Sequence, residues 1–181
     1  AYRRADLSAN IKIYELDHPV TQQLKRTRIA ALGIATPSNL HYLPINFEHQ
    51  SVADVLVDSS FDPKQPTFFS WLGTIPYLTR DLVFETLRSI ARFQPSGAEI
   101  VFDYANTNIS LHDQAAVEKL KKFTQRRGEP LITQFDALTL ESNMHSLGFV
   151  LIENIPQSEW RLHYYDSRLT MDLHPLSVAH M

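Results

Sequence analysis

Acidic and amide side chains follow two short β-branched stretches of the sequence, and their types suit a ligand with a sugar and a base. Glu15 and Asp17 come at the end of the first stretch, and Asn46 and Phe47 end the second. At the end of a parallel strand a carboxylate can accept two hydrogen bonds from a ribose diol. Asn46 offers a donor and an acceptor to an adenine edge, and Phe47 could stack on the ring. These residues predict a site for an adenosine-type ligand, with an empty cleft as the alternative.

Asp17 has a second interpretation, as a helix cap. Pro19, two residues later, is favoured at the first position of a helix. Apolar and small residues recur behind it at helical spacing, at Val20, Leu24, Thr27 and Ala31. A carboxylate just before a helix often caps its N terminus. From these residues alone, both the ribose contact and the cap stay open for Asp17.

Two later stretches also end in groups that could reach a ligand. The almost continuously apolar run 67–72 is typical of a central parallel strand buried on both faces, and it leads into Gly73. A glycine there lets a ligand approach the backbone closely. The run 98–104 contains Asp103 near its end, although a lone acid at a strand end more often fixes a neighbouring loop.

Several kinds of chemistry are excluded by spacing or composition. The eight histidines show no metal-binding spacing, so we expect no metal site. Cysteine is absent, which removes disulfides and thiol catalysis. The five glycines lie far apart, so neither a dinucleotide fingerprint nor a P-loop occurs. A serine-hydrolase elbow is also lacking.

The elements that must position these residues alternate between strand and helix. We expect strands at 11–16, 39–47, 67–72, 98–104, 149–153 and 174–181. The helices expected between them start after 19, at 51, 79, 110, 135 and 157. This order predicts a doubly wound, mostly parallel α/β sheet. Pro44 cannot donate to a ladder, so the second strand should lie near a sheet edge.

Length and charge complete the expectations from composition. A chain of 181 residues fits one domain, 1–181. A net charge of −3 gives no basic footprint for nucleic acid. No apolar run is long enough to cross a bilayer, and no signal peptide is visible. We therefore expect a cytoplasmic protein without nucleic-acid or membrane partners.

Six blocks of the sequence occur in the order and spacing of a known family, and together they cover nearly the whole chain. They are Ala1-Tyr2-Arg3, Tyr14-Glu15-Leu16-Asp17-His18-Pro19, Leu43-Pro44-Ile45-Asn46-Phe47, Phe68-Phe69-Ser70-Trp71-Leu72-Gly73, Pro76-Tyr77-Leu78-Thr79 and Phe102-Asp103-Tyr104. The chain resembles the leucine carboxyl methyltransferase-like family, and within it the bacterial branch of S-adenosylmethionine-dependent O-methyltransferases.

The resemblance implies a class I methyltransferase-like sheet of seven strands, of which the last is antiparallel. It also implies that Asp17 holds S-adenosylmethionine and that Asn46 and Phe47 lie beside the adenine. In the family, a strand and a Gly-rich loop come just before the position of Ala1, so we expect a sheet that lacks its first, central strand. Many relatives carry Asp in place of Asn46 and an acid in place of Leu72.

The function that the resemblance implies is methyl transfer from a sulfonium to a carboxylate or hydroxyl oxygen of a small molecule or protein. Tyr77 and Tyr104 are the candidates for the acceptor side of the cleft, and their alternative role is to pack the rim of the core. The rival function is a non-catalytic, methyltransferase-like module that pairs with a partner or with itself through an open strand edge. Because the expected sheet lacks its first strand, the runs 11–16 and 67–72 should have no shared neighbour.

Overall fold

The structure is a computed structural model, and it describes residues 2, 10–93, 97–156, 159–160, 164 and 179–180. The chain divides into two compact units, Ala1–Lys64 and Gln65–Met181. None of the described helices combines the length and the apolar character needed to cross a membrane.

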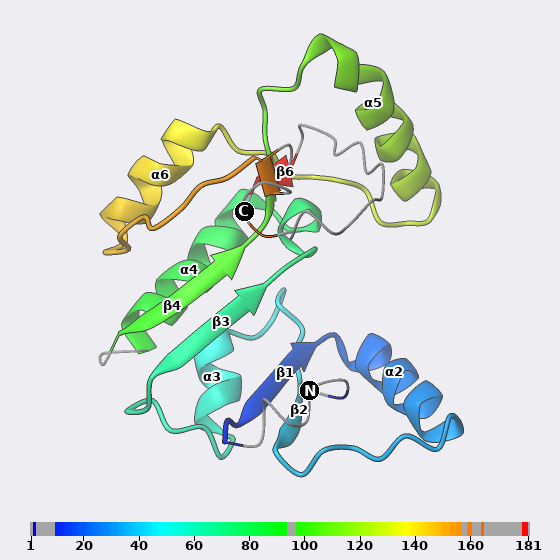
Figure 1. Cartoon of the computed structure of the whole chain (residues 1–181), viewed down its shortest axis with the longest axis vertical. Coiled ribbons are helices and arrows are strands. Elements are labelled where there is room, and N and C mark those ends of the chain that lie inside the picture. Colours follow the sequence, from blue (N-terminus) through cyan, green and yellow to red (C-terminus); the bar gives the residue numbers. More distant parts are fainter. Residues whose placement is uncertain are drawn as a thin grey trace. The chain divides into compact units, whose positions relative to one another are not determined.

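The first unit is built from two parallel strands and two helices (Figure 1). Their order is β1 (Ile13–Asp17), α2 (Pro19–Ala31), β2 (Leu40–Pro44) and α3 (Val52–Val57). The two strands pair so that the last residue of one lies opposite the last residue of the other. Their carboxyl ends therefore meet at one edge of the unit, as the sequence predicts for its first two strands.

The N terminus of α2 differs from the expected one. His18 is the N-cap, and its Nδ1 accepts a hydrogen bond from the Val20 N–H at 3.4 Å. Asp17 lies one residue earlier and ends β1, so the interpretation of Asp17 as the cap of this helix is wrong. The helix stops at Ala31, and Gly33 follows with a φ of 66°, a conformation that glycine adopts without strain.

The expected apolar face of α2 is not buried. Val20 is 70% exposed and Leu24 is 50% exposed, whereas the buried side chain of this helix is Gln22. Gln22 Nε2 donates to the carbonyl oxygen of Glu15 at 3.0 Å, so a hydrogen bond to β1 fixes the helix on this side. These apolar residues do lie at helical spacing, but nothing in the described part of the unit covers them.

The second unit contains a parallel pair of strands with helices packed on it (Figure 1). Its elements, in chain order, are β3 (Thr67–Trp71), the 3₁₀ turn η1 (Ile75–Tyr77), α4 (Arg80–Phe93), β4 (Ala98–Phe102), β5 (Tyr104–Ala105), α5 (Leu111–Arg126), α6 (Ala137–Ser146) and β6 (Ala179–His180). β6 pairs with β5 and is antiparallel, as the family implies for the last strand.

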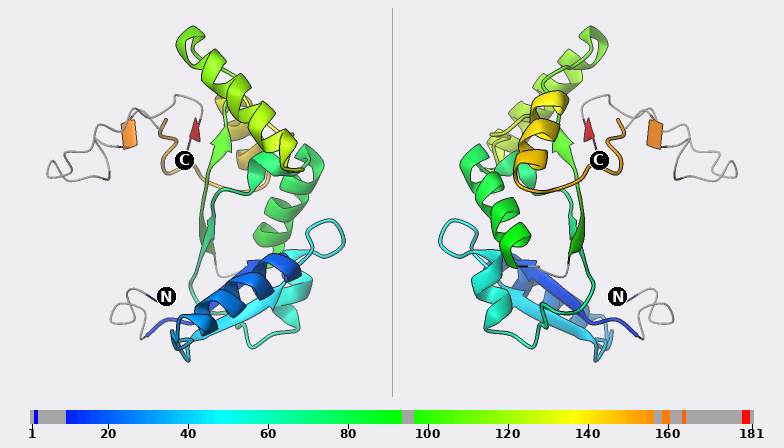
Figure 2. Two further views of the ribbon diagram at one scale, coloured as in Figure 1. Left: turned by 90° about the vertical axis from the view of Figure 1, so that its right-hand side faces the viewer. Right: turned by 90° about the vertical axis from the view of Figure 1, so that its left-hand side faces the viewer.

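The core of the second unit lies between the strand pair and two helices. α4 and α6 lie on the same side of β3 and β4 (Figure 2). The buried cluster consists of Ile75, Val83, Leu87, Tyr104, Phe135 and Leu140. The Thr79 hydroxyl accepts from the Leu82 N–H at 3.4 Å, so Thr79 caps α4 at the position where the sequence predicts that a helix starts.

Two strand predictions for this unit are wrong. β3 is not buried on both faces, because its side chains alternate in exposure and Phe68 is 62% exposed. The run 149–153 forms no strand, since it has no ladder partner among the described residues. An isolated extended segment without a neighbour has no means of satisfying its backbone as a strand. The predicted helix 157–167 and most of the predicted strand 174–181 lie outside the described residues.

The parallel strands form one separate pair in each unit. Within the described residues, β1 pairs only with β2, and β3 pairs only with β4. The two parallel pairs share no strand, so each of the four strands keeps one edge without a parallel partner.

Candidate functional site

In the first unit, the ends of β1 and β2 bring three predicted residues together. The Ile45 N–H donates to the carbonyl oxygen of Asp17 at 2.9 Å, one residue past the end of β2. This bond extends the pairing of the two strands and places Asn46 and Phe47 next to the end of β1. Because Ile45 is fully buried, the backbone at this point is firmly anchored. The structure thus assembles the Asp17, Asn46 and Phe47 group that the sequence predicted.

The carboxylate of Asp17 contributes to the shape of its own turn. Its Oδ1 accepts a hydrogen bond from the His18 N–H at 2.7 Å. The side chain makes no second hydrogen bond to a residue in the described part of the chain. Asp17 is half-buried, so its remaining acceptor capacity is held in a fixed orientation at the strand end. This arrangement suits a carboxylate that accepts hydrogen bonds from a ligand diol.

Asn46 uses its carbonyl end locally. Its Oδ1 accepts from the Glu48 N–H at 3.0 Å, and its own N–H donates to Gln50 Oε1 at 3.1 Å. The first bond is an Asx turn, which commonly fixes the start of a loop. The side-chain NH₂ group of Asn46 remains as a donor that could contact a base. Asn46 and Phe47 are both half-buried.

Glu15 faces the helix. Its Oε2 pairs with Lys25 Nζ of α2 at 2.5 Å. Its other oxygen, Oε1, is buried and has no hydrogen-bond partner in the described part of the chain. Glu15 and Asp17 share one face of β1, since they lie two residues apart. The ion pair gives Glu15 a role in holding α2 on the sheet, which sets it apart from Asp17.

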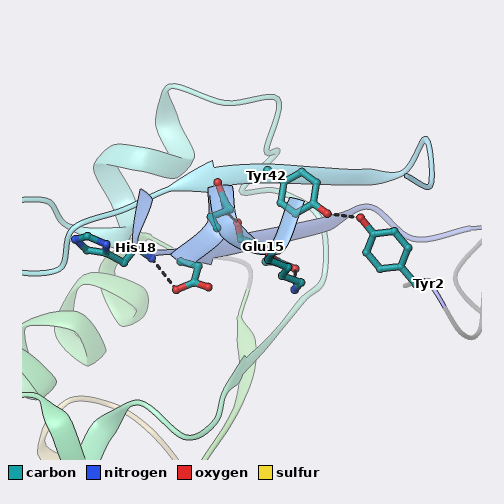
Figure 3. A network of polar contacts seen from close by, with 7 residues as sticks. Tyr2, Glu15, His18 and Tyr42 are labelled. Carbon is teal, nitrogen blue, oxygen red and sulfur yellow. Dashed lines mark hydrogen bonds and ion pairs between the residues drawn. The ribbon is translucent and has the colours of Figure 1, made fainter. Parts of the chain in front are cut away.

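A tyrosine pair beside Glu15 was missed by the sequence analysis. The hydroxyls of Tyr2 and Tyr42 are hydrogen-bonded, and Glu15 lies next to them (Figure 3). Burial, the hydrogen bond to Tyr2 and the nearby Glu15 carboxylate raise the pKa of Tyr42 to about 12. The Arg26 guanidinium lies 5.0 Å from the centre of the Tyr42 ring. Glu15 lies opposite Tyr42 in the β1–β2 pair. The sequence could have indicated this contact only if the register of the two strands had been known.

In the second unit, the ends of β3 and β4 are joined by a side chain. Asp103 Oδ1 accepts a hydrogen bond from the Gly73 N–H at 2.6 Å. Asp103 therefore fixes the loop that follows β3, which is the role expected of a lone acid at a strand end. Gly73 has a φ of 70°, and a Cβ placed on it would meet nothing within 4 Å. The positive φ requires a glycine at position 73, and the space beside its Cα is open.

Tyr77 and Tyr104 occupy different environments. Tyr77 belongs to η1 and is 37% exposed. Tyr104 is 3% exposed and belongs to the buried cluster, and its hydroxyl donates to Asn154 Oδ1 at 3.0 Å. Burial raises the pKa of Tyr104, and the bond to Asn154 acts in the opposite direction. Tyr104 therefore has the alternative role predicted for it, which is to pack in the core. Tyr77, in contrast, has an accessible surface.

The predicted site residues thus form two groups. Glu15, Asp17, Asn46 and Phe47 belong to the first unit, and Gly73, Tyr77, Asp103 and Tyr104 belong to the second. Within each unit they gather at the carboxyl ends of parallel strands, the edge at which open α/β sheets bind ligands.

This α/β order with parallel strand pairs defines a Rossmann-like fold of the class I methyltransferase type. The S-adenosylmethionine-dependent methyltransferase SibL has a similar fold in its apo form, with a TM-score of 0.57 and 15% identity over 97% of this chain and 45% of that chain. A duf574 family protein from Streptomyces avermitilis matches with a TM-score of 0.64 and 11% identity, over 97% of this chain and 76% of that chain.

The sequence comparison gives the family. The chain belongs to the leucine carboxyl methyltransferase family, whose model matches residues 1–91. It is 29% identical over 169 residues to YktD of Bacillus subtilis (strain 168), a protein named as an S-adenosyl-L-methionine-dependent methyltransferase. That match covers 92% of this chain and 55% of YktD, so the chain spans about half the length of this relative. The family predicted from the sequence is confirmed.

Proposed function

We propose that the chain is part of an S-adenosylmethionine-dependent O-methyltransferase. The observation that carries this proposal is the grouping of Asp17, Asn46 and Phe47 at the paired ends of β1 and β2. In a family of methyltransferases, this group supplies the contacts that an adenosine needs. Asp17 would accept from the ribose hydroxyls, the Asn46 amide would donate to the adenine edge, and Phe47 would stack on the base. Glu15 would support this group through its ion pair with α2. In the second unit, Gly73 stays a predicted position at which a ligand could approach the backbone closely.

The reaction requires little from the protein beyond alignment. The acceptor oxygen forms a bond to the methyl carbon while the carbon–sulfur bond breaks, and the sulfonium becomes a thioether. Holding the three atoms in line can supply about 7 to 11 kcal/mol of the barrier. A carboxylate acceptor has no proton to lose, so it needs no general base, whereas a hydroxyl acceptor releases its proton to solvent or to a base.

On the acceptor side, Tyr77 is the better of the two tyrosine candidates. It is partly exposed and follows the Gly73 loop closely in the sequence, whereas the hydroxyl of Tyr104 is buried in the core and bonded to Asn154. We propose a carboxylate or hydroxyl of a small molecule or protein as the acceptor. A cytoplasmic location, one domain at 1–181, and self-association stay predictions from the sequence.

A second candidate function is a non-catalytic module that binds a partner through a strand edge. Among the described residues, β1 and β3 each have one edge without a strand partner, and this favours the module because open strand edges pair readily with other chains. The two functions make opposite predictions about the cofactor. An enzyme must bind S-adenosylmethionine and transfer its methyl group, whereas the module needs neither.

Binding of S-adenosylhomocysteine, measured by titration calorimetry, is the first test, and transfer of a labelled methyl group to carboxylate and hydroxyl acceptors is the second. Saturable binding that Asp17→Ala weakens supports the enzyme. Absence of binding, in a protein whose folding is verified by circular dichroism, would favour the non-catalytic module. Methyl transfer to nitrogen acceptors alone would contradict the assignment to oxygen.

A further inference from the structure

The second half of α5 carries a dense run of positive charge. Between residues 119 and 127 the chain has five cations and no acid, although its net charge as a whole is −3. The five are Lys119, Lys121, Lys122, Arg126 and Arg127. The helix dipole favours cations in the last turn, but this effect does not extend beyond that turn. Lys119 and Lys122 lie before the last turn of α5, so the dipole does not account for them.

Three of these cations form a line on the side of α5 that faces away from the unit. Val117 and Thr124 are buried, so they mark the inner face of the helix. Lys119, Lys122 and Arg126 are exposed and follow one another at intervals of three and four residues. At 3.6 residues per turn this spacing places them in one row, on the face opposite the buried residues. We call these three residues the cationic row, and Figure 1 shows α5 at the margin of the second unit.

No carboxylate neutralises the cationic row in the part of the chain that the structure describes. Glu118, which directly precedes the row, pairs instead with Lys121 Nζ at 3.5 Å. The three side chains of the row make no ion pair and no hydrogen bond with any other described residue. Like charges one turn apart on a helix repel each other and destabilise it. The row therefore destabilises the isolated helix and is available to an anionic partner.

Apolar side chains flank the cationic row. Leu120 is 41% exposed and Phe123 is 51% exposed, and each directly follows a lysine of the row in the sequence. The Arg127 guanidinium lies 4.3 Å from the centre of the Phe123 ring, which holds this ring at the surface. Aromatic residues and Arg are enriched in protein interfaces. A partner should therefore offer carboxylates to the row and apolar side chains beside them.

The arrangement of charge favours a polypeptide over a membrane or a nucleic acid. A helix that lies in a membrane interface buries an apolar face in the lipid. In α5 the cations occupy the middle of the exposed face, and the apolar residues lie at its side. A nucleic acid is typically bound by a domain that is basic overall, whereas this chain has a net negative charge. An acidic polypeptide requires only the local row.

The spacing of the row indicates the conformation of the partner. Intervals of three and four residues correspond to about 4.5 and 6 Å along a helix axis. An antiparallel helix presents glutamates at the same two distances when they are four and then three residues apart. Side chains on one face of an extended strand repeat every 7 Å or so, about 7 Å being two residues of rise, which does not fit the shorter interval. A helix is therefore the better match.

We propose that the cationic row of α5 binds an acidic α-helix of a partner protein. Glutamates of that helix face Lys119, Lys122 and Arg126, and its neighbouring apolar residues contact Phe123. This surface lies in the second unit and contains none of the predicted cofactor residues. The inference does not depend on the proposed methyl transfer.

The probe is a fluorescently labelled peptide, Ala-Ala-Ala-Gln-Ala-Glu-Leu-Ala-Ala-Glu-Leu-Ala-Glu-Leu-Ala-Ala-Gln-Ala-Ala. Its glutamates lie on one face of a helix, and a leucine follows each of them, as apolar residues follow the two lysines of the row. The permuted peptide Ala-Ala-Ala-Gln-Ala-Glu-Leu-Glu-Ala-Ala-Leu-Glu-Ala-Leu-Ala-Ala-Gln-Ala-Ala has the same composition, but its glutamates are spread around the helix. Binding of each peptide to the full chain is measured by fluorescence anisotropy at low and high salt.

Two triple variants of the chain test the row. The first combines Lys119→Gln, Lys122→Gln and Arg126→Gln. The second is the matched control and combines Lys12→Gln, Lys64→Gln and Arg92→Gln, which removes two lysines and one arginine that are exposed elsewhere. Circular dichroism verifies that both variants are folded.

We expect the probe to bind the unmodified chain, and to bind the row variant at least about fivefold more weakly. High salt should weaken binding, because exposed ion pairs are screened. The control variant should bind like the unmodified chain, and the permuted peptide should bind more weakly than the probe. Absence of probe binding, equal loss in both variants, or equal binding of both peptides would overturn the proposal. Tighter binding of phosphatidylserine vesicles or duplex DNA than of the probe, lost in the row variant, would assign the row to that partner instead.

A charge swap tests the contact between the two helices. Lys122→Glu should weaken binding of the probe, because two carboxylates then face each other. A probe in which Lys replaces the middle glutamate should bind Lys122→Glu more tightly than the original probe does. If this swapped probe prefers the unmodified chain, the proposed alignment of the two helices is wrong.

Discussion

The carboxylate of Asp103 accepts a hydrogen bond from the backbone N–H of Gly73 at 2.6 Å. These two residues come directly after β4 and shortly after β3, so the bond ties together the carboxyl ends of two parallel strands. It also holds a glycine with positive φ in the loop that leads to η1. The loop that follows β3 is therefore fixed by a contact within its own unit.

Replacing Asp103 should loosen this loop and lower the free energy of unfolding. Asp103→Ala removes the only acceptor that the structure shows for the Gly73 N–H, and we expect a loss of about 1 kcal/mol because the bond is partly exposed. Asp103→Asn keeps an acceptor oxygen and should lose less. Urea unfolding of the three proteins measures the difference. Equal stability of Asp103→Ala and the unmodified chain would show that the bond contributes nothing.

Replacing Asp17 should weaken cofactor binding. Without its carboxylate two ribose hydroxyls lose their acceptor, which should cost about 1.5 to 3 kcal/mol of affinity for S-adenosylhomocysteine. Glu15→Ala is the matched control, because it removes a carboxylate from the same face of β1 but one that is paired with Lys25. It should reduce affinity less. Titration calorimetry measures the affinity of both variants. A larger loss for Glu15→Ala than for Asp17→Ala would assign the ribose contact to Glu15.

Phe47 should contribute to the adenine end of the ligand only. Phe47→Ala should lose stacking worth on the order of 1 kcal/mol. S-adenosylmethionine and S-adenosylhomocysteine should be weakened equally, since they differ only at the sulfur. Phe47→Leu, which keeps the apolar bulk without a ring face, separates stacking from packing. A loss for one ligand alone would place Phe47 near the methyl group.

The tyrosine pair of the first unit should make stability depend on alkaline pH. The pKa of Tyr42 is raised from 10.0 to about 12 by burial and by the hydrogen bond to Tyr2. An unfolded tyrosine loses its proton near the lower value, so the contribution of neutral Tyr42 is fully present below pH 10 and is lost as the pH rises toward 12.

The free energy of unfolding of the unmodified chain should thus fall more steeply above pH 10 than that of Tyr42→Phe. Tyr2→Phe removes the hydrogen bond that helps to raise the pKa of Tyr42, so the fall should be smaller and should end at a lower pH. Denaturant unfolding at a series of pH values measures both slopes. Parallel curves for the unmodified chain and Tyr42→Phe would contradict the raised pKa.

The sequence by itself determined the features that depend on near neighbours along the chain. The helix starts predicted at 79 and 110 are examples, because the hydroxyls of Thr79 and Ser110 accept from the N–H groups three residues on, those of Leu82 and Asp113. The order of strands and helices up to α6, and the family, followed from local patterns and from motif blocks. The same holds for the residues at the ends of β1 and β2, since parallel strands bring their ends to one edge.

The tertiary structure decided what each pattern packs against. The apolar spacing of α2 could not indicate that Val20 is exposed. Burial requires a packing partner from a distant part of the sequence, and the spacing does not say whether such a partner exists. The run 149–153 has strand-like residues, yet a strand also needs a partner for its backbone, and the described residues provide none. Tyr104 and Asp103 are adjacent in sequence, but only the packing buries the first in the core and turns the second to the Gly73 N–H. Local hydrogen bonds are specified by sequence spacing, whereas burial and pairing depend on contacts between segments far apart in the chain.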